Sequence, residues 1–115
     1  MSQTSTSLEQ EQAVGLYDLT NLGKMKDLGT LAPEAMAAFV AFDKAALADG
    51  TIPKKYKELI ALAVACTTQC PYCIDIHTNS ARKLGATEPE LAETVLVAAA
   101  LRAGGAITHG THALK

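Results

Sequence analysis

The stretch PKKYKELIALAVACTTQCPYCIDIHTNSARKLG, residues 53–85, predicts two helices joined by a short turn. Pro53 and Pro71 each suit the first turn of a helix, where the missing N–H group of proline costs no hydrogen bond. The first helix is expected to run to about Thr68. Its run from Leu59 to Cys66 is apolar on all sides, which is typical of a helix buried by neighbours or by another subunit.

The second helix of this stretch is expected to end at Gly85 and to carry two reactive groups on its apolar side. At 100° per residue, Cys73 and His77 share a stripe with Ile74 and other apolar residues. Charged side chains such as Asp75 lie on the opposite side. Cys73 and His77 are therefore expected to point toward the interior.

Further helices are expected on both sides of this pair. Thr87-Glu88-Pro89-Glu90 has the pattern of a capping box, in which the first and last side chains satisfy backbone N–H groups, and it predicts a helix to Arg102. Gly104-Gly105 is expected to end that helix. The other expected segments are a short helix with an irregular continuation at 13–29, a helix at 33–48 and a short last helix at 106–115.

These patterns predict an all-α fold class, a compact helical domain of five to six helices with C-x-x-C at the N-terminus of a central helix. The composition is 49% apolar but only 4% aromatic, which favours closely packed helices. A chain of 115 residues is expected to form one domain, over residues 13–115, after a flexible N-terminal arm at 1–12. A core of small side chains buries little area per residue, so we expect a homo-oligomer.

Charge and hydropathy exclude several classes of function. The formal net charge of −2 argues against binding to nucleic acid. Residues 1–12 lack the basic and apolar regions of a secretory signal. The longest wholly apolar run, 59–66, is far shorter than the roughly 20 residues that cross a membrane. We therefore expect a cytoplasmic protein without a membrane partner, in which a C-x-x-C pair is redox-active or metal-binding.

The run Cys70-Pro71-Tyr72-Cys73-Ile74-Asp75-Ile76-His77 has the layout of a thiol–disulfide site. Cys70 is expected at the N-cap and Cys73 in the first helical turn, where the positive end of the helix dipole favours the thiolate form of both. His77 lies four residues after Cys73 and so on the same face. The imidazole can take the thiol proton or hold the thiolate as an ion pair.

Glu58 is the last charged residue before the apolar run of the first helix. At about 1.5 Å per residue it lies about 15 Å from the turn, and His77 lies about 10 Å back along the returning helix. An antiparallel pair would bring the carboxylate close enough to orient the imidazole, directly or through one water. The alternative is that Glu58 is a solvated charge that pairs with Lys54 or Lys55 of its own helix.

Metal binding is the main rival interpretation of the cysteine pair. Cys70, Cys73 and His77 supply three of the four ligands that zinc prefers, and His109 or His112 are candidate fourth ligands. The second half of a structural zinc motif is absent from the sequence. We therefore expect neither a metal nor a cofactor.

Three other residue types are expected to be structural. Cys66 is expected to behave as a small, inert core side chain. Tyr72 is expected to pack in the core or at an interface. His109 and His112, three residues apart, are expected to be a surface pair and stay outside the catalytic set.

The arrangement of Glu58, then eleven residues, then Cys70-x-x-Cys73-x-x-x-His77, resembles the signature of AhpD-like alkylhydroperoxidases in the carboxymuconolactone decarboxylase superfamily. The resemblance covers about residues 33–105. It implies an all-helical subunit that assembles into homotrimers or homohexamers. It also implies reduction of alkyl hydroperoxides or hydrogen peroxide, with Cys73 as the peroxidatic thiolate, Cys70 as the resolving thiol, and Glu58 with His77 as a proton relay.

The function implied by the resemblance is that of a thiol-dependent peroxidase or disulfide oxidoreductase, re-reduced by an external dithiol or a protein reductant. The chain departs from the founding enzymes in carrying Tyr72 where they have a histidine, and in being one short unit where they fold two related halves. One alternative is a lactone enzyme of the carboxymuconolactone decarboxylase type, whose chemistry has no use for a dithiol. The other is a non-enzymatic redox-sensing or zinc-binding module.

Overall fold

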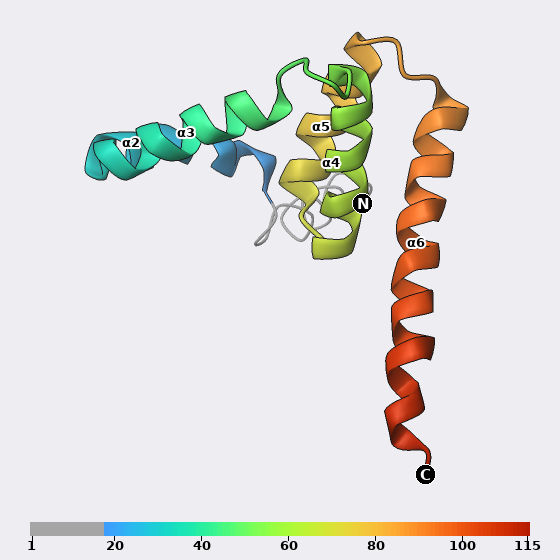
Figure 1. Cartoon of the computed structure of the whole chain (residues 1–115). Helices are drawn as coiled ribbons and strands as arrows, with labels where there is room; N and C mark the ends of the chain where they lie inside the picture. Colours follow the sequence, from blue (N-terminus) through green and yellow to red (C-terminus); the bar gives the residue numbers. More distant parts are fainter. Residues whose placement is uncertain (1–17) are drawn as a thin grey trace, which may run out of the picture. The chain divides into compact units, whose positions relative to one another are not determined.

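A computed structural model describes residues 18–115 (Figure 1). The predicted arm at 1–12 lies outside the described residues. Within them the chain forms helices and connecting turns and no strand, which confirms the all-α fold class. The elements are η1 (Leu19–Lys24), α2 (Met25–Leu31), α3 (Pro33–Leu47), α4 (Lys54–Thr68), α5 (Pro71–Lys83), α6 (Glu88–Gly110) and η2 (Thr111–Ala113), where η marks a 3₁₀ helix.

The chain divides into two compact units, one ending at Ala46 and one running from Leu47 to Lys115. In the first unit the sequence predicts a short helix followed by irregular chain over 13–29. In the described part of this range the 3₁₀ helix η1 comes first and the helix α2 follows, so the prediction is wrong there. Asp18 sets this start, since its carboxylate accepts a hydrogen bond from the Thr20 N–H group at 2.9 Å, which also lowers the pKa of Asp18. The expectation of a single domain over 13–115 stays a prediction.

In the second unit α4 and α5 form an antiparallel hairpin (Figure 1). The turn consists of Gln69 and Cys70, between Thr68 and Pro71. Gln69 ends α4 in the left-handed conformation, with φ of 57°, which reverses the chain. Cys70 then caps α5 and Pro71 takes its first position. The predicted pair of helices is therefore present, and its tight turn fixes the register of α5 against α4.

The apolar core of this unit is small and lies where α4, α5 and α6 meet. One residue from each helix forms its centre: Leu62, Ala81 and Leu91. Four partly buried side chains pack against this centre: Leu59, Cys66, Ile74 and Ala86. Ala81 is fully buried, so a larger side chain there would separate the helices.

The start of α6 has the predicted capping box. The Thr87 N–H group donates to Glu90 Oε1 at 2.9 Å, and the Glu90 N–H group donates to Thr87 Oγ1 at 3.3 Å. The hydrogen bond from the Thr87 N–H group is also the main cause of a lowered pKa for Glu90.

The end of α6 was predicted wrongly. The helix does not stop at Gly104-Gly105 but continues to Gly110, and only the single 3₁₀ turn η2 follows in place of a separate last helix. A glycine weakens a helix by about 1 kcal/mol relative to alanine, and it commonly ends one where its backbone takes a positive φ. Gly85, with φ of 93° just after α5, has that conformation.

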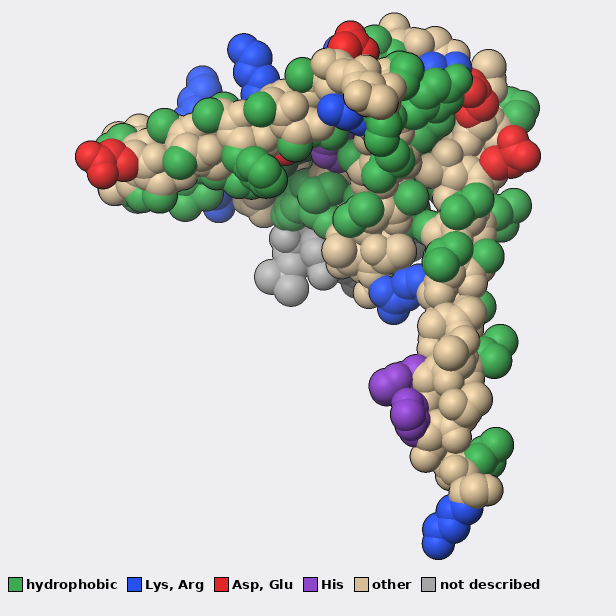
Figure 2. All heavy atoms as spheres, in the orientation of Figure 1, with side chains coloured by type: hydrophobic (Ala, Val, Ile, Leu, Met, Phe, Trp, Pro, Cys, Tyr) green, Lys and Arg blue, Asp and Glu red, His purple; other side chains and the backbone are tan. Residues whose placement is uncertain are grey.

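Much of the apolar surface of α6 is exposed (Figure 2). Leu101 is 69% exposed and Ile107 is 74% exposed. Counted to Ala113, this segment is long and apolar enough to cross a membrane by length and composition alone, and only 11% of it is buried. The prediction of no spanning segment rested on unbroken apolar runs, and threonine, glycine and charged residues keep such runs short in α6.

Candidate thiol site

The two cysteines lie at the N-terminus of α5. Cys70 is the N-cap, and its Sγ accepts a hydrogen bond from the Cys73 N–H group at 3.2 Å. A sulfur in this position satisfies one of the N–H groups that the first helical turn leaves without a partner. Both cysteines are free thiols and half-buried. The thiols therefore sit at the positive end of α5, as the sequence predicts.

The two thiols interact with each other, and their pKa values move in opposite directions. The hydrogen bond between the side chains of Cys70 and Cys73 is the main cause that lowers the pKa of Cys70, and the backbone N–H groups of Tyr72 and Cys73 add to it. The same hydrogen bond, with burial and the charge of Cys70, raises the pKa of Cys73 to about 11. Of the two thiols, Cys70 is therefore the one that loses its proton more readily, and Cys73 the one that keeps it.

The carboxylate of Glu58 lies against the imidazole of His77. Glu58 is only 3% exposed, and its Oε2 lies 2.6 Å from Nδ1 of His77. A buried carboxylate needs such a partner, because burial without one costs several kcal/mol. When Nδ1–H of a neutral His77 donates to Glu58, Nε2 is left as the atom that can accept a proton. The antiparallel pairing of α4 and α5 brings these two residues together.

The four site residues thus form two pairs, one at the start of α5 and one between α5 and α4. Cys70 and Cys73 contact each other at the start of the helix, and His77 contacts Glu58 one turn further on. Cys73 and His77 are four residues apart, so the second thiol and the imidazole share a face of α5. The catalytic roles of all four residues stay predictions.

Lys54 completes the surroundings of Glu58. Its Nζ lies 3.4 Å from Glu58 Oε1 and 3.0 Å from the Leu47 carbonyl oxygen. From the sequence, Lys54 was expected only as an alternative partner that would make Glu58 a solvated charge. In the structure Glu58 is buried and contacts both Lys54 and His77. The spacing of four residues between Lys54 and Glu58 is the sequence signal from which this contact could have been predicted.

The other two histidines lie away from the thiol site. His109 and His112 are exposed at the end of α6 and in η2, with ring centroids 5.1 Å apart in an edge-to-face arrangement. Tyr72 is half-buried between the cysteines. Over residues 18–115, the structure brings no three His, Cys, Asp or Glu side chains together in a way that would hold a metal ion.

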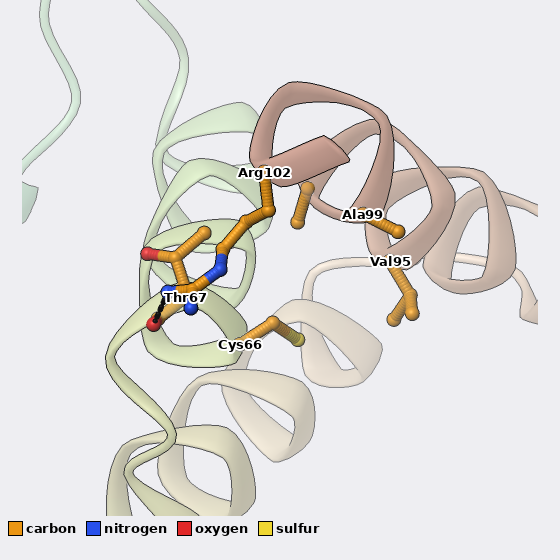
Figure 3. A pocket seen from close by; sticks show the side chains of 6 residues that line it. Cys66, Thr67, Val95, Ala99 and Arg102 are labelled. Atoms are coloured by element: carbon orange, nitrogen blue, oxygen red, sulfur yellow. Dashed lines mark hydrogen bonds between the residues drawn. The ribbon is translucent and has the colours of Figure 1, made fainter. Parts of the chain in front are cut away.

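Cys66 lines a separate cavity of about 350 Å³ (Figure 3). The other lining residues come from α4 and α6: Thr67, Val95, Ala98, Ala99 and Arg102. Nη1 of Arg102 donates to the Thr67 carbonyl oxygen and so ties α6 to the end of α4. Cys66 also packs against the core, as predicted, but one side of it faces this cavity.

Known proteins share this architecture and sequence. The pattern of the Carboxymuconolactone decarboxylase family matches residues 33–115. A protein of Paracoccus denitrificans described as "Uncharacterized protein 4 in cox locus" is 49% identical over 77 residues, which are 67% of this chain and 69% of that protein. A segment of 61 residues is 38% identical to an alkyl hydroperoxide reductase of Mycobacterium tuberculosis, and covers 53% of this chain but 15% of that protein.

Two solved structures resemble the fold. A carboxymuconolactone decarboxylase family protein from Legionella pneumophila superimposes with a TM-score of 0.66 and 40% identity, over 70% of this chain and 71% of that one. A protein from Methanobacterium thermoautotrophicum superimposes with a TM-score of 0.71 and 32% identity, over 75% of this chain and 97% of that one. The helical arrangement is therefore shared across bacterial and archaeal relatives.

Proposed function

This chain belongs to the carboxymuconolactone decarboxylase family, and we propose that it is a thiol-dependent peroxidase or disulfide oxidoreductase whose redox pair is Cys70 and Cys73. One observation carries the proposal: the buried contact between Glu58 and His77, at 2.6 Å, lies one helical turn from a dithiol at a helix N-terminus. A base oriented by a carboxylate beside a thiol is the arrangement that activates a sulfur nucleophile.

The first step is attack of the Cys73 sulfur on the O–O bond of a hydroperoxide. Because the pKa of Cys73 is raised to about 11, its proton must leave as the attack occurs. Nε2 of His77 is the acceptor, and Glu58 stabilises the imidazolium that forms. The S–O bond forms, the O–O bond breaks, and the leaving oxygen takes the proton from His77 to give an alcohol or water. Cys73 is oxidised by two electrons to a sulfenic acid.

The second step forms a disulfide. The thiolate of Cys70 attacks the sulfenic sulfur of Cys73, the S–S bond forms, the S–O bond breaks, and hydroxide leaves and is protonated to water. The lowered pKa of Cys70 favours the thiolate that this step needs. An external dithiol then attacks the disulfide, is itself oxidised by two electrons, and restores both thiols.

The proposed reaction needs a reducing environment, and we propose the cytoplasm as its location. We also propose that the protein acts as a homotrimer or homohexamer. The support is the exposed apolar surface of α6, which includes Leu101 and Ile107, because contiguous apolar surface of this kind marks interaction sites in soluble proteins. A second copy that covers α6 is favoured over a membrane because α6 keeps Glu93 and Arg102 as exposed charges within its apolar stretch.

Peroxide consumption tests the activity. With dithiothreitol as reductant, the wild-type protein is expected to consume hydrogen peroxide or an alkyl hydroperoxide in many turnovers. Cys73→Ser should abolish turnover, while Cys66→Ser is the matched control that removes a thiol outside the site and should keep the rate. A Cys73→Ser variant that retains the full rate would refute the proposal.

A further inference from the structure

Lys54 is the charged side chain beside the Glu58–His77 pair that the proposed chemistry does not use. Glu58 is 3% exposed, and its two carboxylate oxygens have different partners, with Lys54 Nζ at Oε1 and His77 Nδ1 at Oε2. The lysine is itself held in place, because Nζ donates to the Leu47 carbonyl oxygen at 3.0 Å. Its backbone N–H group also donates to Asp49 Oδ1 at 2.7 Å.

We propose that Lys54 is a positioning residue: its ammonium group keeps the buried carboxylate of Glu58 ionised and oriented, and thereby sets the pH range in which His77 can accept a proton. The inference rests on the proposed function only in giving His77 the part of a proton acceptor.

The electrostatic reason is that Lys54 offsets the charge of Glu58. A carboxylate alone against an imidazole stabilises the imidazolium form, which cannot accept a further proton. A positive charge on the other carboxylate oxygen reduces that effect. Removing the ammonium charge of Lys54 should therefore raise the pH at which His77 becomes protonated.

Other charged groups nearby have separate partners. On α4, Lys55 pairs with Glu90 of α6 at 3.0 Å. Lys57 donates to the Ala48 carbonyl oxygen at 2.7 Å. On α5 the titratable neighbours of His77 are Cys73 one turn away, Cys70 two turns away, and Asp75, which is exposed. Of the lysines and arginines in residues 18–115, Lys54 is therefore the one in contact with Glu58.

Lys57 provides a matched control. Both lysines tie the first turns of α4 to a backbone carbonyl of the preceding segment, but of the two only Lys54 contacts the Glu58 carboxylate. Lys54→Met removes the tie and the charge at Glu58. Lys57→Met also removes a tie and a charge, but that charge does not contact Glu58. Lys54→Gln keeps a hydrogen-bond donor without the charge, and Lys54→Arg keeps the charge.

The test is an NMR titration of the histidine rings, which needs no peroxidase activity. The resonance of His77 is assigned by its loss in His77→Asn, and His109 and His112 serve as internal references. Lys54→Met and Lys54→Gln should raise the titration midpoint of His77 by about one pH unit. Lys57→Met and Lys54→Arg should leave it unchanged. If Lys54→Met does not fold, Lys54→Gln alone decides the outcome.

The pH profile of peroxide reduction is measured in parallel, and its acidic limb should move to higher pH in the same two variants. A His77 midpoint that is the same in Lys54→Gln and the wild type would overturn the role of Lys54. A shifted midpoint in a protein that reduces no peroxide would instead overturn the proposed function and leave the role of Lys54 standing.

Discussion

Replacing Cys70 with alanine should make Cys73 more reactive at neutral pH. Two of the three causes that raise the pKa of Cys73 to about 11 come from Cys70, namely its hydrogen bond and its charge. At pH 7 a pKa of about 11 leaves about one Cys73 in ten thousand as thiolate, and a pKa near 9 leaves about one in a hundred. The thiolate fraction therefore rises by up to about 100-fold.

The rate of alkylation should rise less than the thiolate fraction. Nucleophilicity falls with pKa at a Brønsted slope of about 0.4–0.5, so a decrease of two pKa units costs roughly tenfold per thiolate. The expected net gain is at most about tenfold, because the burial that also raises the pKa of Cys73 remains. Iodoacetamide labelling with fragment mass spectrometry, which assigns the label to each cysteine, measures it. The reverse variant, Cys73→Ala, should slow the labelling of Cys70, because the hydrogen bond that lowers its pKa is lost. Unchanged labelling of Cys73 in Cys70→Ala would show that the thiols are not coupled.

Three further predictions concern the relay, the core and the assembly. Glu58→Gln should lower the rate of peroxide reduction about 100-fold, because His77 loses the carboxylate that stabilises its protonated form; a rate within twofold of wild type would contradict this. Leu62→Ala, at a position 2% exposed, should lower the free energy of unfolding by about 2–5 kcal/mol in urea denaturation, whereas an exposed control, Ile60→Ala, should cost much less. Leu101→Asp should shift light scattering from an oligomer toward a monomer, and Glu93→Gln should not; an unchanged mass would argue against assembly through α6.

The helices at the site could be predicted from sequence because their limits depend on local signals. Pro71 and the capping box of Thr87 and Glu90 each fix a helix start through the first turn alone. The rise per residue then placed Glu58 near His77, since a two-residue turn leaves little freedom in the pairing of α4 and α5. The direct contact at 2.6 Å agrees with that estimate.

Other features depend on interactions that no local pattern contains. The helix dipole acts on both thiols alike, so sequence reasoning favoured ionisation of both, whereas the hydrogen bond between Cys70 and Cys73 separates them. Gly104 and Gly105 looked like a helix end, but the positive φ that would end the helix is absent there. The long α6 instead continues as one helix whose apolar surface is largely exposed.

The claim that Cys70 and Cys73 form one redox pair is tested most directly by intact-mass and peptide mass spectrometry after one equivalent of hydrogen peroxide. The account predicts the loss of two hydrogen atoms from the peptide that contains both cysteines, a free Cys66, and full reversal by dithiothreitol. A disulfide that includes Cys66 would contradict the claim. So would a Cys70–Cys73 pair that stays reduced although peroxide is still present.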